Sequence, residues 1–214
     1  MRNLNRRSFL KGVAGATAIL SAPSIAVDGA VLGANERLQL AVCGLNGRGR
    51  SHIGGFGAVE NVQLTHLVDP DENVLARSVR DLQKKVGKGY EVNGHADVRE
   101  ALEDKNLDGI TVAAPNHWHS LMTIWAAQAG KHCYVEKPAS HDVYEGRVAT
   151  EAWRKYGVVI QHGTQQRSDA SRAGLTQAIK DGKWGRLKIA YGYCCKPRGG
   201  IGFEKIGDPP AHLD

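Results

Sequence analysis

From residue 38 onward, short apolar runs alternate with longer segments in which apolar residues recur at helical spacing. The apolar runs predict strands over residues 38–43, 61–68, 109–114, 132–135 and 158–161. The segments between them predict helices over residues 50–58, 72–86, 97–103, 117–129 and 143–156. Strands and helices that alternate at these lengths are typical of βαβ units. The pattern therefore predicts the α/β fold class, with a doubly wound parallel sheet.

The pattern changes after residue 161. A helix is expected over residues 170–181 and a strand over residues 186–194, followed by a stretch rich in glycine and proline over residues 197–210. One strand after a complete α/β unit does not form a sheet of its own. We therefore expect this strand to pair with another chain or to belong to a domain that is cut short. Its unpaired edge predicts self-association of the isolated chain.

The charge of the chain is concentrated at its beginning. The 214 residues carry 28 Lys and Arg against 22 Asp and Glu, a formal net charge of +6. Residues 1–26 contain four of the basic residues and no acidic residue, so the remainder is close to neutral. A nearly neutral body lacks the basic footprint of a nucleic-acid-binding protein. With 42% hydrophobic and 23% charged residues, the composition is that of a globular protein.

The basic segment has the pattern of an export signal. Arg6 and Arg7 are followed by Ser-Phe-Leu-Lys and by a small-residue apolar stretch that is too short for a membrane span. We expect residues 1–34 to be a twin-arginine signal peptide and linker, cleaved after Ala26 or Ala34, and the protein to lie outside the cytoplasm. A basic tail or an uncleaved anchor is the alternative.

The cysteines and histidines do not have the spacing of a metal site. The sequence has four cysteines without a C-x-x-C pair, and it has no H-E-x-x-H motif. His117 and His119 are two residues apart, so they do not share a helix face. We expect no metal and no structural disulfide, with Cys43 and Cys133 as buried thiols.

The first strand leads into the hexapeptide Gly-Leu-Asn-Gly-Arg-Gly over residues 44–49. Gly44 and Gly49 match the first and third glycines of the G-x-G-x-x-G dinucleotide fingerprint, while Asn46 replaces the second. Gly47 is expected to supply the missing room for the cofactor. The following helix offers free N–H groups to a pyrophosphate. With a strand before it and a helix after it, the hexapeptide predicts a Rossmann-type fold.

An acidic residue stands at the end of the second strand. Asp69 lies 20 residues after Gly49, the place of the residue that binds the ribose hydroxyls of NAD. Its charge and that of Asp71 favour NAD over NADP, although the nearby Arg48 and Arg50 weaken this inference and NADP stays open. Alternatively, Asp69 is only an N-cap of the next helix.

A second group of polar residues follows the later strands. The sequence Ala-Pro-Asn-His-Trp-His occupies residues 114–119, Glu-Lys-Pro occupies residues 136–138, and Gln-His-Gly-Thr-Gln-Gln-Arg-Ser occupies residues 161–168. Together with the glycine motif and Asp69, these stretches resemble the Gfo/Idh/MocA family, the relatives of glucose–fructose oxidoreductase and inositol dehydrogenase. The resemblance runs from about residue 37 to residue 214, and together with the twin-arginine leader the chain resembles exported bacterial members.

The resemblance implies roles for individual residues. Lys137 is the expected catalytic residue, holding the substrate hydroxyl that becomes a carbonyl, and Pro138 is expected to follow a cis peptide bond. Glu136 is expected to contact the cofactor ribose, and His119 to cap a helix or touch the cofactor. The full cofactor-binding set is Gly44, Asn46, Gly47, Arg48, Gly49, Asp69, Pro115, Asn116, His119 and Glu136, and Gln165 and Arg167 are expected to face the substrate.

The resemblance also implies a domain arrangement and a function. We expect an NAD(P)-binding Rossmann domain over residues 35–165 and the start of a truncated α+β substrate domain over residues 166–214. The implied activity is NAD(P)-dependent hydride transfer at a hydroxyl carbon of a sugar, polyol or related compound, with hydrolysis or epimerisation through transient oxidation as a variant. Expected partners are this small molecule and a homo-oligomer through the C-terminal sheet. The alternative is a nucleotide-binding remnant or partner-dependent subunit without turnover.

Overall fold

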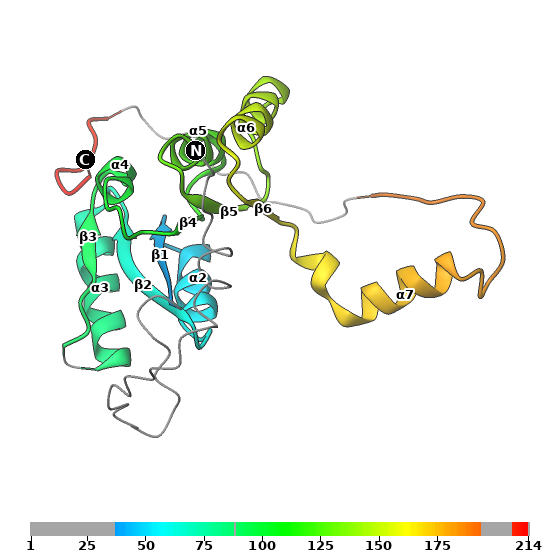
Figure 1. Cartoon of the computed structure of the whole chain (residues 1–214), viewed down its shortest axis with the longest axis horizontal. Coiled ribbons are helices and arrows are strands. Elements are labelled where there is room, and N and C mark those ends of the chain that lie inside the picture. The colour runs from blue at the N-terminus through cyan, green and yellow to red at the C-terminus, as the bar shows by residue number, and fades with distance from the viewer. Residues whose placement is uncertain (1–36, 88, 194–206, 214) are drawn as a thin grey trace, which may run out of the picture. The chain divides into compact units, whose positions relative to one another are not determined.

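The structure is a computed structural model that describes residues 37–87, 89–193 and 207–213. At its centre is a six-stranded parallel sheet with the strand order β3-β2-β1-β4-β5-β6 (Figure 1). The strands are β1 (Leu38–Cys43), β2 (Val62–Val68), β3 (Asn93–His95), β4 (Gly109–Val112), β5 (His132–Glu136) and β6 (Ile160–Gly163). The expected doubly wound Rossmann-type sheet is confirmed.

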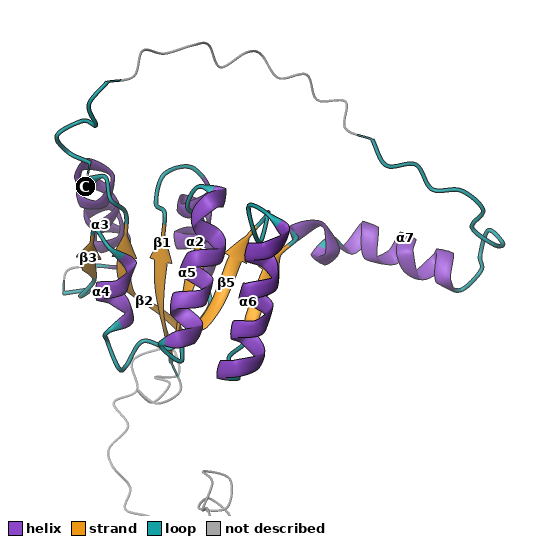
Figure 2. Cartoon of the chain, turned by 90° about the horizontal axis from the view of Figure 1, so that it is seen from above, coloured by secondary structure: helices purple, strands orange, loops and turns teal. Residues whose placement is uncertain are grey.

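Helices cover both faces of this sheet. They are α2 (Arg48–Phe56), α3 (Glu72–Val86), α4 (Val98–Leu102), α5 (Asn116–Gln128) and α6 (Val143–Tyr156), followed by a 3-10 turn η2 (Gln165–Ser168) and α7 (Ala170–Lys180). Because side chains alternate along a strand, Ala41 and Cys43 of β1 pack with residues of α4 and α5, whereas Val42 packs with residues of α2 and α3. Figure 2 shows α5 and α6 beside each other on one face.

The sequence pattern missed or shifted some element boundaries. It gave no strand at β3, because the three residues Asn-Gly-His carry no apolar alternation. Helix α2 begins at Arg48 instead of residue 50, with Gly47 as its N-cap. Strand β6 spans Ile160–Gly163 instead of residues 158–161, so its end reaches further toward η2.

The strand expected over residues 186–194 is wrong for residues 186–193, the part that the structure describes. These residues form no regular element, and the side chains of Leu187, Ile189 and Tyr191 are 61–83% exposed. A strand is stabilised by a neighbour that pairs with its backbone, and the described residues offer none here. In helix α7, likewise, no residue is buried.

The two described cysteines are buried free thiols, as expected. Burial raises the pKa of Cys133 to about 12, so this thiol stays protonated and unreactive. Cys43 lies on β1 and Cys133 on β5, with β4 between them. Two strand spacings amount to roughly 10 Å, which is beyond the reach of a disulfide.

Some expectations fall outside the described residues. These include the twin-arginine leader over residues 1–34, and Cys194 and Cys195. The domain division at residue 165, export and oligomerisation stay predictions. None of the helices that the structure describes is long and apolar enough to cross a membrane.

The glycine turn after β1 depends on two close backbone approaches. Gly44 has a φ of +80°, and a Cβ there would lie 2.6 Å from the backbone nitrogen of Ala114, just beyond β4. A Cβ on Gly49 would lie 1.8 Å from the Gly44 carbonyl oxygen. Since the sheet order reverses between β1 and β4, these contacts occur at the switch point where α/β sheets bind ligands.

We expect Gly49→Ala to lower the free energy of unfolding by about 3 kcal/mol, because the new methyl group displaces the Gly44 turn. Gly54→Ala in the same helix is the matched control, since a Cβ there meets nothing within 4 Å. The control should stabilise the chain by about 0.5–1 kcal/mol through its helix propensity. Urea unfolding of both variants measures the difference, and equal effects would contradict this account of the turn.

Candidate active site

The N-terminus of α2 is shaped to receive an anion. Its N-cap Gly47 has a φ of 64° and open space around it, no side chain caps the helix, and the first turn contains no acidic residue. Free backbone N–H groups and the positive end of the helix dipole therefore remain available. A dinucleotide pyrophosphate fits this end of the helix. Asn46 lies nearby and accepts a hydrogen bond from Arg50 at 3.4 Å.

Asp69 is held by the backbone around it. Its Oδ2 accepts a hydrogen bond from the backbone N–H of Leu45 at 2.8 Å, and its Oδ1 accepts one from Asp71 at 3.0 Å. The carboxylate thus ties the glycine turn to the end of β2. The alternative that Asp69 caps α3 is wrong, because the N-cap is Asp71, which accepts hydrogen bonds from Asn73 and Val74.

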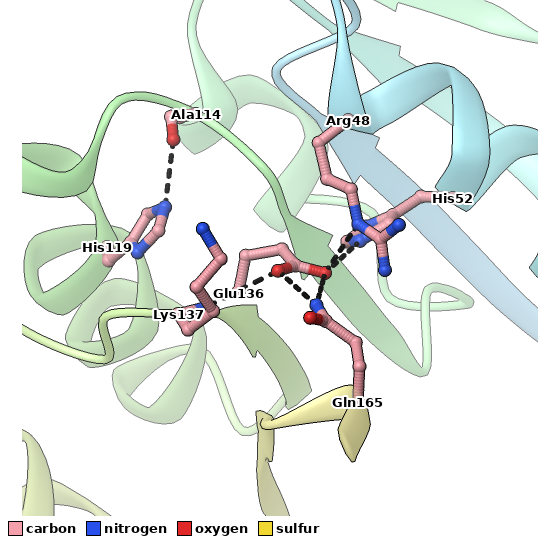
Figure 3. Close-up of polar contacts among 7 residues, drawn as sticks. All are labelled: Arg48, His52, Ala114, His119, Glu136, Lys137 and Gln165. Atoms are coloured by element: carbon pink, nitrogen blue, oxygen red, sulfur yellow. Dashed lines mark hydrogen bonds and ion pairs between the residues drawn. The ribbon is translucent and has the colours of Figure 1, made fainter. Parts of the chain in front are cut away.

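A buried carboxylate lies at the end of β5. Glu136 Oε1 accepts a hydrogen bond from Arg48 Nε at 2.9 Å and lies 3.0 Å from His52 Nε2, which donates because a carboxylate only accepts (Figure 3). Gln165 Nε2 lies 2.8 Å from Oε1 and 2.6 Å from Oε2. Two segments far apart in the sequence, α2 and η2, therefore converge on one side chain of β5.

These donors keep Glu136 ionised. Burial by itself raises the pKa of the carboxyl, but the hydrogen bonds from His52, Arg48 and Gln165, with the positive charge of Arg48, outweigh burial and lower the pKa to about 2. The Arg48 and Glu136 charges offset each other, so the cluster carries no net charge when His52 is neutral.

Lys137 extends from the end of β5 between His119 and the Glu136 carboxylate (Figure 3). It lines a cavity of about 320 Å³ together with Arg48, Ala113, Ala114, His119, Glu136 and Gln165. Within the part of the chain that the structure describes, no carboxylate lies within ion-pair distance of its amine. The amine is therefore available to a ligand in this cavity. The Lys137–Pro138 peptide bond is cis, as expected.

His119 joins the two loops that border this cavity. Its Nε2 lies 2.8 Å from the carbonyl oxygen of Ala114, and its Nδ1 contacts the carbonyl oxygen of Pro138. The alternative that His119 caps α5 is wrong, because the N-cap is Pro115 and no side chain caps that helix. The buried ring instead fixes the loop after β4 against the loop after β5.

The structure brings together only part of the expected set. Arg48, His119, Glu136, Lys137 and Gln165 line one cavity. Arg167 lines the neighbouring cavity, which Gln165 also borders. The remaining residues, Gly44, Asn46, Gly47, Gly49, Asp69, Pro115 and Asn116, lie in the turns and helix starts at the carboxyl ends of β1, β2 and β4 without lining either cavity. No group of described His, Cys, Asp or Glu side chains is arranged to hold a metal ion.

Sequence reasoning missed His52, although a signal was present. His52 follows Arg48 by four residues in α2, so both side chains lie on one helix face. The ring is buried and packs edge-on against Phe56 and Tyr134, with centroids 5.7 and 5.5 Å away. The sequence could not show that this ring reaches Glu136, because that contact depends on where β5 lies relative to α2.

Comparison with known proteins agrees with this geometry. The model of the oxidoreductase family with an NAD-binding Rossmann fold matches residues 38–164. The chain belongs to the Gfo/Idh/MocA family. This match spans the glycine turn, Asp69, Lys137 and the end of β6, so this family member contains an NAD-binding Rossmann domain.

The chain is similar to relatives with different net reactions. It is 28% identical over 164 residues to the alpha-N-acetylgalactosaminidase of Shewanella oneidensis, covering 68% of this chain and 36% of that protein. It is 28% identical over 154 residues to the myo-inositol 2-dehydrogenase of Thermotoga maritima, covering 71% and 43% respectively.

Solved structures give the same match. A probable dehydrogenase from Thermotoga maritima has a TM-score of 0.62 and 26% identity, covering 68% of this chain and 41% of that one. GenD2 from gentamicin A biosynthesis, solved in complex with NAD, has a TM-score of 0.60 and 27% identity, covering 74% and 43%. This Gfo/Idh/MocA chain thus spans less than half the length of these relatives.

We expect Glu136→Gln to lower the free energy of unfolding at pH 7 by about 2 kcal/mol, because Arg48 loses its counter-charge and one of the two acceptor oxygens becomes an amide NH2 that faces other donors. The folded pKa of about 2 lies below the ordinary value of 4.5, so the contribution of the carboxylate is complete above pH 4.5 and disappears as the pH falls toward 2. The stability difference between wild type and variant should shrink over that interval.

Denaturant unfolding between pH 7 and pH 2 tests this dependence. Glu151→Gln on the exposed surface of α6 is the control and should change stability by less than about 0.5 kcal/mol at every pH. If the stability difference between wild type and Glu136→Gln stayed constant down to pH 2, these donors would not lower the pKa of Glu136.

Proposed function

We propose that this chain takes part in NAD-dependent hydride transfer at a hydroxyl-bearing carbon of a sugar, polyol or related compound. The observation that carries the proposal is the Lys137 amine, which lines a cavity at the switch-point edge of an NAD-binding fold without a carboxylate partner among the described residues. A dehydrogenase acting on myo-inositol among the similar proteins supports the substrate class.

The cofactor-binding residues are those of the glycine turn. The open N-terminus of α2 would hold the pyrophosphate, and Asp69 would face the adenosine ribose at the end of β2. When bound, NAD supplies the hydride acceptor. Arg48 bonds Glu136 through Nε, which leaves the other end of its guanidinium for a phosphate oxygen.

Lys137 is the proposed catalytic residue. When the hydroxyl becomes a carbonyl, the neutral Lys137 amine would accept the hydroxyl proton, and the ammonium formed in this way would donate a hydrogen bond to the substrate oxygen. Glu136 is a positioning residue in this proposal, because its oxygens are occupied by protein donors and its place next to Lys137 fixes the strand end.

The net reaction is open within this class. Similarity to both a glycosidase and a dehydrogenase supports a shared oxidation step, with hydrolysis as a variant. Family membership favours an oxidoreductase over a nucleotide-binding subunit without turnover. Export by the twin-arginine route remains a prediction that rests on residues 1–34.

We expect NADH to quench the emission of the four tryptophans in a saturable manner and to raise the unfolding temperature of the purified chain. At an NADH concentration 100 times the Kd, linkage adds about 2.7 kcal/mol to the stability. NADPH should bind more weakly because Asp69 and Asp71 repel its 2′-phosphate. If neither nucleotide changes emission or stability, the cofactor proposal fails.

We expect Lys137→Ala to slow NADH formation from NAD and myo-inositol, used as a polyol probe, by about 100-fold or more. The Kd for NADH should change by less than about threefold, because the proposed role concerns the substrate oxygen. Lys155→Ala on α6 is the control and should leave both quantities unchanged. Wild-type chain that binds NADH but turns over no polyol would favour the subunit without turnover.

A further inference from the structure

A second cavity adjoins the one that contains Lys137. Its volume is about 440 Å³, within the range of small-molecule sites, and Gln165 borders both cavities. Its lining comes from the middle of β5, from β6, and from η2 with its N-cap: Tyr134, Gln161, His162, Gly163, Thr164, Gln165, Arg167 and Ser168. The shared residue makes the two cavities neighbours, so a substrate that extends past Gln165 would occupy both.

The second cavity presents several uncommitted hydrogen-bond donors. Among the described residues, the hydroxyls of Tyr134, Thr164 and Ser168 and the guanidinium of Arg167 make no hydrogen bond or ion pair, whereas the Gln165 amide is bonded to Glu136. Burial, with a smaller effect of the Glu136 charge, raises the pKa of Tyr134, so its hydroxyl remains a neutral donor at pH 7. These donors are suited to an acceptor-rich group.

The charge of this cavity is positive. No Asp or Glu lines it, and Arg167 is its only permanently ionised group. Glu136 lies beyond Gln165, where the charge of Arg48 offsets it. Asp169 follows Ser168, but its carboxylate caps α7 by accepting from the backbone of Arg172 at 2.9 Å. An anion in this cavity therefore meets a cation without a competing lining carboxylate.

The wall between the two cavities is held in an unusual conformation. Gln165 has a φ of 29°, in the left-handed region that side-chain-bearing residues rarely adopt. Its two contacts to Glu136 hold it there. Backbone strain of this kind concentrates at ligand sites, where the surrounding structure fixes it. Gln165 is thus held by Glu136 in the place where it borders both cavities.

We propose that this second cavity binds an anionic oxygen group of the substrate, a carboxylate or a phosphate, with Arg167 as its principal ligand. The proposal rests on the proposed function, because it assumes that the reacting carbon lies at Lys137. The planar guanidinium presents a fork of N–H donors that matches two oxygens of either group, and the three hydroxyls supply the further donors. The substrate is accordingly an acidic derivative of a sugar or polyol.

Calorimetric titration of the full chain, with and without saturating NADH, tests this subsite. The probes are glucuronate, glucose 6-phosphate and glucose, so the first two distinguish a carboxylate from a phosphate. We expect at least one anionic probe to bind at least 10-fold more tightly than glucose. Arg167→Gln should remove this preference, and Arg167→Lys should restore only part of it because an ammonium lacks the fork.

Arg154→Gln on α6 is the matched control, since it removes the same charge from the surface and should leave the preference unchanged. Equal binding of all three probes, or a preference that survives Arg167→Gln, overturns the subsite. Failure of the proposed function is separable, because it would appear as absent NADH binding or absent turnover, whereas the anion preference is measured by binding alone and without the nucleotide.

Discussion

The carboxylate of Glu136 is the constraint on which the site depends. A buried carboxylate persists as an anion only when donors surround it, and here those donors come from α2 and η2. Since Glu136 itself ends β5, one charge ties the helix after the glycine turn, the strand end that carries Lys137 and the turn after β6. Glu136 is the one residue common to all of these contacts, so its loss would remove every link among the three segments.

The parallel sheet makes this convergence possible. Each βαβ unit returns its strand to the same direction, so the segments that follow β1, β4, β5 and β6 meet at one edge. His119 then joins two of these segments by contacting carbonyl groups of Ala114 and Pro138. Side-chain contacts thus link the loops of this edge, and the Lys137 amine lies beside them without an ion-pair partner among the described residues.

The family match covers some segments of this sheet edge and not others. The glycine turn and Lys137 lie within the matched family region, whereas η2 extends beyond its end at residue 164. Proteins similar to this chain include an alpha-N-acetylgalactosaminidase and a myo-inositol 2-dehydrogenase, which differ in the compounds that their names give. In the proposed subsite, Gln165, Arg167 and Ser168 are the lining residues beyond the matched region, and we propose that they contribute to substrate discrimination.

The sequence by itself determined the strand and helix alternation, the place of the glycine turn and the position of Lys137 at a strand end. Each follows from local periodicity or from neighbours in the chain, which a sequence displays directly. The strand predicted at residues 186–193 is wrong because an alternating apolar pattern forms a strand only when a partner strand is present.

Only the tertiary structure decided which side chains meet. Arg48 and His52 lie 88 and 84 residues from Glu136, and Gln165 lies 29 residues away, so no spacing rule connects them. The sequence therefore predicted Glu136 as a cofactor ligand and Gln165 as a substrate ligand, and the fold showed that they bind each other. The donors that pair with a buried charge are set by which segments the sheet places next to it, and the order of residues along the chain does not show this.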